Sequence, residues 1–230
     1  MDRLNISYKI RFGSHAYGVS TEDSDLDIRG IYLPTLEEFL SLKELKDYED
    51  KDNDIIIYPI NKFFKLAAKS NPSVIEWLFV DEKDILEITE LGREIRDNRD
   101  LFLSQEIYFR FKGYAISEFN ALQKLSGDTG EKRRQQILKY GYNIKSAVNV
   151  IRILEEAIEI LGSGNLILPL INREKLFEIK SGVWSYVQVC EKFERLLKVL
   201  DNAYENSKLP EKCDFEKVDG CLISLLKRYC

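Results

Sequence analysis

GSHAYGVSTEDSDLDIRG, residues 13–30, is the stretch of sequence that decides the fold prediction. It places a Gly-Ser pair ten residues ahead of Asp25-Leu26-Asp27. The preceding residues, 4–12, alternate apolar and polar side chains, which predicts a half-buried strand that enters a tight turn at Gly13. A short helix over residues 14–19 is expected next, and the free N–H groups at its start would suit a phosphate.

A second strand is predicted over residues 25–33. Because side chains alternate faces along a strand, Asp25 and Asp27 would share one side, while Leu26 and Ile28 would share the other. Two adjacent carboxylates repel each other unless a cation lies between them, and Mg²⁺ prefers oxygen ligands and substrate phosphates. Taken alone, an Asp-Ser-Asp run is typical of an acidic surface loop. Its coupling to a strand and to a Gly-Ser turn favours a metal site.

These motifs resemble the signature of the DNA polymerase β superfamily of nucleotidyltransferases. The longer run GSHAYG…DSDLDIRG resembles one branch of it, the RNA repair pathway DNA polymerase β family, which also has a K-x-NP segment and a helical C-terminal region. Residues 69–72, Lys-Ser-Asn-Pro, match that segment and are followed by Val74 to Leu78. His15 stands where arginine is common in that branch. The resemblance is strong to about Phe79 and looser from Tyr140 to Leu154.

The resemblance implies a third carboxylate on a later strand, and Asp54 is the candidate. It opens the run DIIIYPI, which is apolar and β-branched like a buried central strand. Asp52, expected on the same face of that strand, is the reserve choice. The alternative is that the acidic and lysine-rich residues 46–54 are only a solvated flank of the strand.

With three carboxylates, the resemblance implies a two-metal mechanism. Asp25, Asp27 and Asp54 would be both the metal ligands and the catalytic residues, holding two Mg²⁺ ions. The Gly13-Ser14 turn would hold the triphosphate of an NTP, and ATP is the NTP that we expect. In-line attack by an acceptor hydroxyl on the α-phosphorus would then release pyrophosphate.

The second half of the chain changes to long helical periodicity, so the expected fold class is α+β: a small mixed-sheet nucleotidyltransferase domain, residues 1–100, followed by a helical domain, residues 101–230. Helices are predicted over residues 60–68, 73–80, 104–125, 131–161, 172–180, 183–206 and 217–229, with turns at 126–130, 162–165 and 207–212.

Several cations are candidates to bind the triphosphate. Lys145 and Arg152 lie seven residues apart and therefore on one helix face, although Glu155 and Glu156 on the same helix make a solvated surface an equal alternative. Nearer the acids in sequence are Lys62 and the other cations of that region, Arg29, Lys65 and Lys69. The sequence does not rank these four cations, and Lys62 is taken as their representative in the nucleotide-binding set with Gly13, Ser14, Lys145 and Arg152.

Composition sets wider limits. A net charge of −5 over 230 residues argues against a broad basic surface that grips nucleic acid. The four cysteines show no C-x-x-C spacing, so a structural zinc site is not expected and reduced thiols are. We find no signal peptide and no long apolar span, which predicts a cytoplasmic protein without a membrane partner. The oligomeric state cannot be read from the sequence.

Three classes of function follow. The first is an enzyme that transfers NMP from an NTP to a hydroxyl, with an RNA end as the acceptor that the resemblance implies. The second keeps this chemistry but adenylylates a protein or a small molecule such as an antibiotic. The third is a nucleotide-binding sensor without turnover, which the intact Gly13, Ser14, Asp25 and Asp27 argue against.

Overall fold

The computed structural model describes residues 4–22, 24–124 and 131–230, and the chain divides into two compact units. The first unit joins Met1–Ser104 to Ile167–Pro169 and Lys212–Cys230, and the second comprises Gln105–Leu166 and Leu170–Glu211. The first unit thus ends its main segment four residues after the predicted boundary at 100 and also takes in the last helix of the chain.

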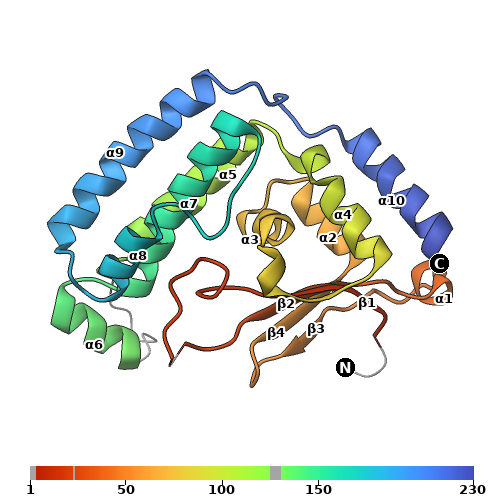
Figure 1. Cartoon of the computed structure of the whole chain (residues 1–230), viewed down its shortest axis with the longest axis horizontal. Helices are drawn as coiled ribbons and strands as arrows, with labels where there is room; N and C mark the ends of the chain where they lie inside the picture. Colours follow the sequence, from red (N-terminus) through yellow and green to blue (C-terminus); the bar gives the residue numbers. More distant parts are fainter. Residues whose placement is uncertain (1–3, 23, 125–130) are drawn as a thin grey trace. The chain divides into compact units, whose positions relative to one another are not determined.

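A five-stranded mixed sheet forms the first unit (Figure 1). Its strands are β1 (Ile6–Arg11), β2 (Ile28–Tyr32), β3 (Tyr48–Asp50), β4 (Ile55–Pro59) and β5 (Ile85–Ile88), in the order β3-β4-β2-β1-β5. β2 and β4 are parallel, whereas β1 pairs antiparallel with β2 and β5, and β3 pairs antiparallel with β4. The α+β class and the mixed sheet are therefore confirmed.

Helices of the first unit cover one face of this sheet (Figure 1). They are α2 (Ile60–Ala67), α3 (Pro72–Ile75) and α4 (Glu90–Asp97). The unit also contains α1 (Leu36–Leu40), which has no buried residue, α10 (Phe215–Tyr229), which packs on α2 and η3, and the 3-10 turns η1 (Glu76–Phe79), η2 (Glu82–Asp84) and η3 (Arg99–Phe102). The helix predicted over 60–68 is confirmed as α2. The one predicted over 73–80 is a short α-helix that tightens into η1, and it starts at Pro72, where the missing N–H costs no hydrogen bond.

Aromatic side chains fill the core between the sheet and these helices. Trp77 is buried, stacks on Tyr58 of β4 with ring centroids 5.2 Å apart, and also stacks on Phe63 of α2 at 5.8 Å. The hydroxyl of Tyr8, on β1, donates to the carbonyl oxygen of Trp77 over 2.7 Å, and burial raises the pKa of Tyr8 well above its ordinary value. This bond satisfies a polar group that would be costly to bury alone.

A β-bulge at Ser7 changes the face on which the first apolar side chain lies. Ile6 pairs with Tyr32, but Tyr8 pairs with Ile31, the adjacent residue, so Ile6 and Tyr8 lie on opposite faces of the sheet. Ile6 consequently joins Tyr32, Ile55 and Ile57 in a separate buried cluster. The predicted uniform alternation over residues 4–12 is therefore wrong at its start.

Helix α10 belongs to the first unit, where it packs on α2 and η3, and its C-terminal end is bonded to Glu94 of α4. The guanidinium of Arg228 makes two hydrogen bonds to the Glu94 carboxylate, and the hydroxyl of Tyr229 donates to the same carboxylate over 2.7 Å. The bond to Glu94 raises the pKa of Tyr229 to about 12, and the same contacts lower the pKa of Glu94.

The second unit is a helical bundle built from α5 (Glu106–Asn120), α6 (Glu131–Tyr140), α7 (Ile144–Ser163), α8 (Arg173–Lys180) and α9 (Tyr186–Glu205). The single helix predicted over 131–161 is wrong, because Gly141 adopts φ +82° and ends α6. The side chain of Asn143 then starts α7 by accepting from the N–H of Ser146 over 2.8 Å. The turn predicted at 126–130 lies outside the described residues.

Helix α7 is central to the bundle and packs on α5 and α9. Phe119 of α5 stacks on Phe193 of α9 with ring centroids 3.9 Å apart. Lys192 of α9 forms an ion pair with Glu155 of α7 at 2.5 Å, and both side chains are nearly buried. Within the described parts of the chain, no disulfide joins the cysteines and no helix has the length and hydropathy needed to cross a bilayer.

Substitution of Gly30 by alanine tests how closely β1 and β2 pack, because it adds one methyl group between them. A Cβ at this position would lie 2.6 Å from the carbonyl oxygen of Tyr8 on the paired strand, so the backbone would have to move. Gly30→Ala should destabilise the first unit by about 2 kcal/mol. Gly220→Ala on α10 is the control, because its Cβ would meet nothing within 4 Å and should stabilise that helix by about 0.5–1 kcal/mol.

Urea unfolding followed by the fluorescence of Trp77, in a Trp184→Phe background, reports on the first unit alone. Equal midpoints for the two glycine variants would contradict the packing described for β1 and β2.

Candidate functional site

The Gly-Ser segment that precedes the acidic residues forms a closed turn. The N–H of Tyr17 donates to the carbonyl oxygen of Gly13 over 3.1 Å, and the N–H of Val19 donates to that of Ser14 over 2.9 Å. Gly13 and Gly18, one at each end, adopt φ +61° and φ +70°. The helix expected over 14–19 is therefore wrong, since a left-handed glycine ends it after one turn.

The carboxylate of Asp27 packs directly against this turn. A Cβ on Gly13 would lie 1.8 Å from Oδ2 of Asp27, so any larger residue there would require the carboxylate to move, and φ +61° independently favours glycine. The backbone joins the same two segments, because the N–H of Phe12 donates to the carbonyl oxygen of Asp27 over 2.8 Å. The structure thus brings together the two motifs that the sequence separates by ten residues.

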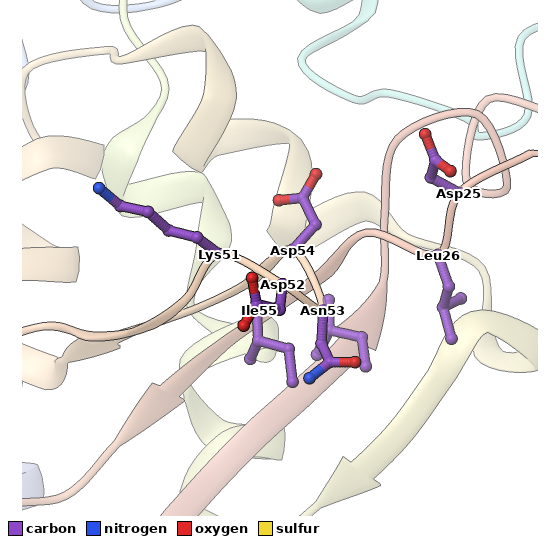
Figure 2. Close-up of a pocket in the computed structure, with 8 residues that line it drawn as sticks. Asp25, Leu26, Lys51, Asp52, Asn53, Asp54 and Ile55 are labelled. Atoms are coloured by element: carbon purple, nitrogen blue, oxygen red, sulfur yellow. The ribbon is translucent and has the colours of Figure 1, made fainter.

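The acidic pair stands just before the second strand, because β2 begins at Ile28. The prediction that Asp25 and Asp27 lie within a strand over 25–33 is therefore wrong in its boundary. Asp25 is exposed and Asp27 is half-buried. Figure 2 shows Asp25 on the segment that leads into β2, with its carboxylate directed away from the side chain of Leu26.

Asp54 lies immediately before β4, at the position that corresponds to Asp27 before β2. The two strands are parallel and pair Ile28 with Ile55, so the residues that precede this pair are neighbours across the sheet. The carbonyl oxygen of Asp54 accepts from the N–H of Ile28 over 3.0 Å. Asp54 adopts φ +47°, a left-handed conformation that a non-glycine residue seldom takes.

The turn that leads into Asp54 is held together by the side chain of Asp50. The side chain of Asp50 accepts from the side-chain amide of Asn53 over 2.8 Å and from the backbone N–H groups of Asn53 and Asp52 over 3.1 Å each. These bonds, that from the Asn53 side chain above all, lower the pKa of Asp50. Asp52, the reserve third acid, belongs to this exposed turn. The prediction that it lies on the strand with Asp54 is therefore wrong.

The guanidinium of Arg29, on β2, connects Asp54 to Asp27. Nη2 lies 2.9 Å from Oδ1 of Asp54 and 3.7 Å from Oδ1 of Asp27. Nη1 donates to the carbonyl oxygens of Asp54, over 2.6 Å, and of Ile28, over 2.8 Å. The sequence placed Arg29 only among the candidates for the triphosphate, and no local pattern indicates a partner 25 residues away.

An open pocket of 610 Å³ lies beside these residues, lined by Asp25, Leu26, Ile28, Lys51, Asp52, Asn53, Asp54 and Ile55. Figure 2 shows the carboxylates of Asp25 and Asp54 directed to the same side of the pocket, opposite to the side chains of Leu26 and Asn53. Within the described residues, however, no three His, Cys, Asp or Glu side chains come close enough together to hold one metal ion.

A buried hydrogen bond that the sequence reasoning missed holds the turn from behind. The hydroxyl of Tyr17 donates to Oε2 of Glu76, on η1, over 2.5 Å. Glu76 is almost completely buried, and the ring of Tyr17 packs edge-on against Phe12 at 5.5 Å. Both partners lie in segments that carry the family resemblance, GSHAYG and the residues after Asn71-Pro72, which is the only sequence signal that pointed to them.

The other predicted nucleotide-binding cations lie elsewhere. Lys62, on α2, forms an ion pair with Asp47 and sits 4.4 Å from the centroid of the Tyr58 ring, and its hydrogen bond to Asp47 raises its pKa. It is not among the residues that line the pocket.

Lys145 and Arg152 are both on α7 of the second unit. Lys145 is exposed, whereas Arg152 is buried and donates to both carboxylate oxygens of Glu156, over 2.7 and 2.9 Å. Nucleotide binding by these three cations stays a prediction.

Comparison with known proteins identifies the class. The chain belongs to the RNA repair pathway DNA polymerase beta family, whose model matches residues 2–227. This membership supports a nucleotidyltransferase-like function.

Two curated relatives match part of the chain. It is 35% identical over 82 residues to the uncharacterized protein YcgL of Bacillus subtilis (strain 168), an alignment that covers 34% of this chain and 32% of YcgL. It is 33% identical over 107 residues to an uncharacterized 38.9 kDa protein of Enterobacteria phage T4, covering 41% of this chain and 32% of the phage protein. The chain thus aligns with about a third of the length of each relative.

A solved structure also aligns with the chain, that of a nucleotidyltransferase-like protein from Exiguobacterium sibiricum 255-15. The identity is 9% and the TM-score 0.29, over 99% of this chain and 76% of that one.

The contact between Gly13 and Asp27 can be tested by a double-mutant cycle. Gly13→Ala should destabilise the first unit, because it adds about 1–2 kcal/mol of left-handed backbone strain to the clash with the Asp27 carboxylate. In an Asp27→Ala background the clash is gone, so the same change should cost about 1–3 kcal/mol less. Urea unfolding of the four proteins gives this coupling. Additive effects would show that the carboxylate does not pack on the turn.

Proposed function

We propose that this chain is a Mg²⁺-dependent nucleotidyltransferase that moves NMP from an NTP, ATP first among them, to an acceptor hydroxyl. The observation that carries the proposal is the packing of the Asp27 carboxylate on Gly13. It sets an anionic group beside a turn that has no side chain in the way, so that a metal-bound phosphate could approach both at once. Membership of the RNA repair pathway DNA polymerase beta family supports the same chemistry.

The residues present fit a divalent ion in part. Asp25 and Asp27 offer the oxygen donors that Mg²⁺ prefers, and they are the side chains that would hold it. When bound, the ion would neutralise phosphate charge and lower the pKa of the attacking hydroxyl. Asp54 is the proposed third ligand, although in this structure its carboxylate is paired with Arg29.

The protein's own groups would orient the substrate. The Gly13-Ser14 turn would bind the phosphates, with the Ser14 hydroxyl and nearby N–H groups as donors. The acceptor oxygen would form a bond to the α-phosphorus while the bond to the bridging oxygen breaks, and pyrophosphate would leave. The hydroxyl proton would pass to a carboxylate, for which Asp54 is our candidate.

An RNA end is the acceptor that the family's description favours. One observation favours a different acceptor: the net charge is −5, and the pocket is lined by three aspartates but by a single lysine among the described residues. Such a surface attracts nucleic acid poorly. Adenylylation of a protein or a small molecule is therefore the second candidate. The cytoplasm, where NTP is plentiful, is the proposed location.

Asp25→Asn and Asp27→Asn test the chemistry. Each should lower turnover about a hundredfold or more, because charge that develops on the phosphoryl group loses its counterion. Asp52→Asn, which removes an exposed carboxylate from the same pocket, should leave turnover unchanged. The assay follows label from each α-labelled NTP with Mg²⁺ into short RNA, protein extract or aminoglycosides.

Label in RNA supports the first proposal, and label in protein or in aminoglycosides supports the second. NTP binding without product under any acceptor would contradict both and leave a sensor.

Asp54→Asn separates a catalytic carboxylate from a structural one. If Asp54 takes part in the reaction, the substitution should lower kcat at least as severely as it weakens NTP binding, since the proton acceptor acts in the transition state. The measurement is single-turnover kinetics beside equilibrium NTP binding. A near-wild-type rate would remove Asp54 from the reaction.

A further inference from the structure

Arg29 occupies the space between two of the three carboxylates that the proposed mechanism assigns to metal. Its Nη2 faces Oδ1 of Asp54 at 2.9 Å and Oδ1 of Asp27 at 3.7 Å. Nη2 faces both oxygens, so a divalent ion held by both carboxylates would compete with it for them. The guanidinium would have to move away before one ion could bind both.

The backbone holds the guanidinium in this position. Nη1 donates to the carbonyl oxygens of Ile28, the first residue of β2, and of Asp54, the residue that precedes β4. The side chain of Arg29 is 15% exposed, whereas that of Asp54 is 51% exposed. The guanidinium is thus sheltered from solvent and held by two backbone carbonyl oxygens.

The same contacts account for the backbone conformation of Asp54. Its carbonyl oxygen accepts from Arg29 and from the N–H of Ile28, and its carboxylate accepts from Arg29. These hydrogen bonds help to hold Asp54 at φ +47°, where a side chain is strained. Arg29 acts as a positioning residue for Asp54, and it also neutralises the charge that would otherwise draw a cation to it.

We propose that Arg29 closes the Asp54 side of the acidic site to divalent ions in the nucleotide-free protein. An ion can then bind at Asp25 and Asp27, but Asp54 becomes a ligand only after the guanidinium is displaced. This inference rests on the proposed function for its meaning, because it makes the second ion conditional on the substrate. It concerns metal binding without nucleotide, however, and is tested there.

Counting bound Mn²⁺ by electron paramagnetic resonance, with the full chain and no nucleotide, tests the proposal. In the wild-type protein, Asp54→Asn should change Mn²⁺ affinity less than twofold, whereas Asp27→Asn should weaken it at least tenfold. Arg29→Gln should bind one more Mn²⁺ per chain than the wild type at the same concentration. The additional ion should be lost in the double variant Arg29→Gln, Asp54→Asn.

Two controls separate this from a general effect of charge. Lys51→Gln removes a cation that lines the same pocket, and it should add no ion. Asp52→Asn in the Arg29→Gln background removes a nearby exposed carboxylate, and the additional ion should remain. The thermal unfolding of each variant establishes that it is folded before Mn²⁺ is added.

The Asp54→Asn measurement stands even if Arg29→Gln does not fold. A tenfold loss of Mn²⁺ affinity in Asp54→Asn would overturn the proposal, because it would show that Asp54 already binds the ion beside Arg29. Equal Mn²⁺ binding by folded Arg29→Gln and wild-type protein would overturn it as well. Failure of nucleotide transfer with the expected Mn²⁺ pattern would instead contradict only the proposed function.

Discussion

The contact between the Asp27 carboxylate and the Cα of Gly13 is the constraint on which the rest of the site depends. A side chain at position 13 would occupy the space of Oδ2 of Asp27, and the positive φ of the turn disfavours one independently. Because the N–H of Phe12 also donates to the carbonyl oxygen of Asp27, the end of β1 and the start of β2 are joined through both backbone and side chain. The buried bond from Tyr17 to Glu76 then ties the turn to the helical layer behind it.

A second constraint comes from parallel pairing. β2 and β4 are neighbours with Ile28 opposite Ile55, so the acids that precede them are brought to one end of the sheet although they are 27 positions apart in sequence. The carboxylates of Asp27 and Asp54 would repel each other, and the positive charge of Arg29 reduces that repulsion because its guanidinium lies near both. The result is an acidic site that already contains the guanidinium of Arg29. Its net charge is therefore less negative than that of three carboxylates without a cation, so it attracts divalent ions less strongly.

Local sequence patterns predicted the elements whose signals are local. Patterns only a few residues long predicted the glycine turn after β1, the apolar strand β4 and the amphipathic helix α2, and the structure contains all three. The edge strands β3 and β5 were not predicted, because Tyr48–Asp50 is three residues long and mostly polar and Ile85–Ile88 has only four residues. Their pairing is set by neighbours. The bulge at Ser7 and the helix break at Gly141 were not predicted either. In each case a single residue interrupts a strand or a helix that the hydrophobic periodicity treats as continuous.

The site shows the same division. Gly13, Ser14, Asp25, Asp27 and Asp54 were singled out from spacing and resemblance, and the structure places Asp27 on the turn and Asp54 across the sheet from it. The partners of these residues were not foreseen, because the bonds from Arg29 to Asp54 and from Tyr17 to Glu76 join residues 25 and 59 positions apart. Such pairings depend on the tertiary fold and leave no periodic trace.

The most direct measurement is a crystal structure of the protein soaked with Mn²⁺ and a non-hydrolysable NTP, with the Mn²⁺ ions located in an anomalous difference map. The account predicts a manganese peak coordinated by Asp25 and Asp27, with the phosphates of the nucleotide against Gly13 and Ser14. A nucleotide bound elsewhere on the chain, with both aspartates facing solvent and no anomalous peak beside them, would contradict it.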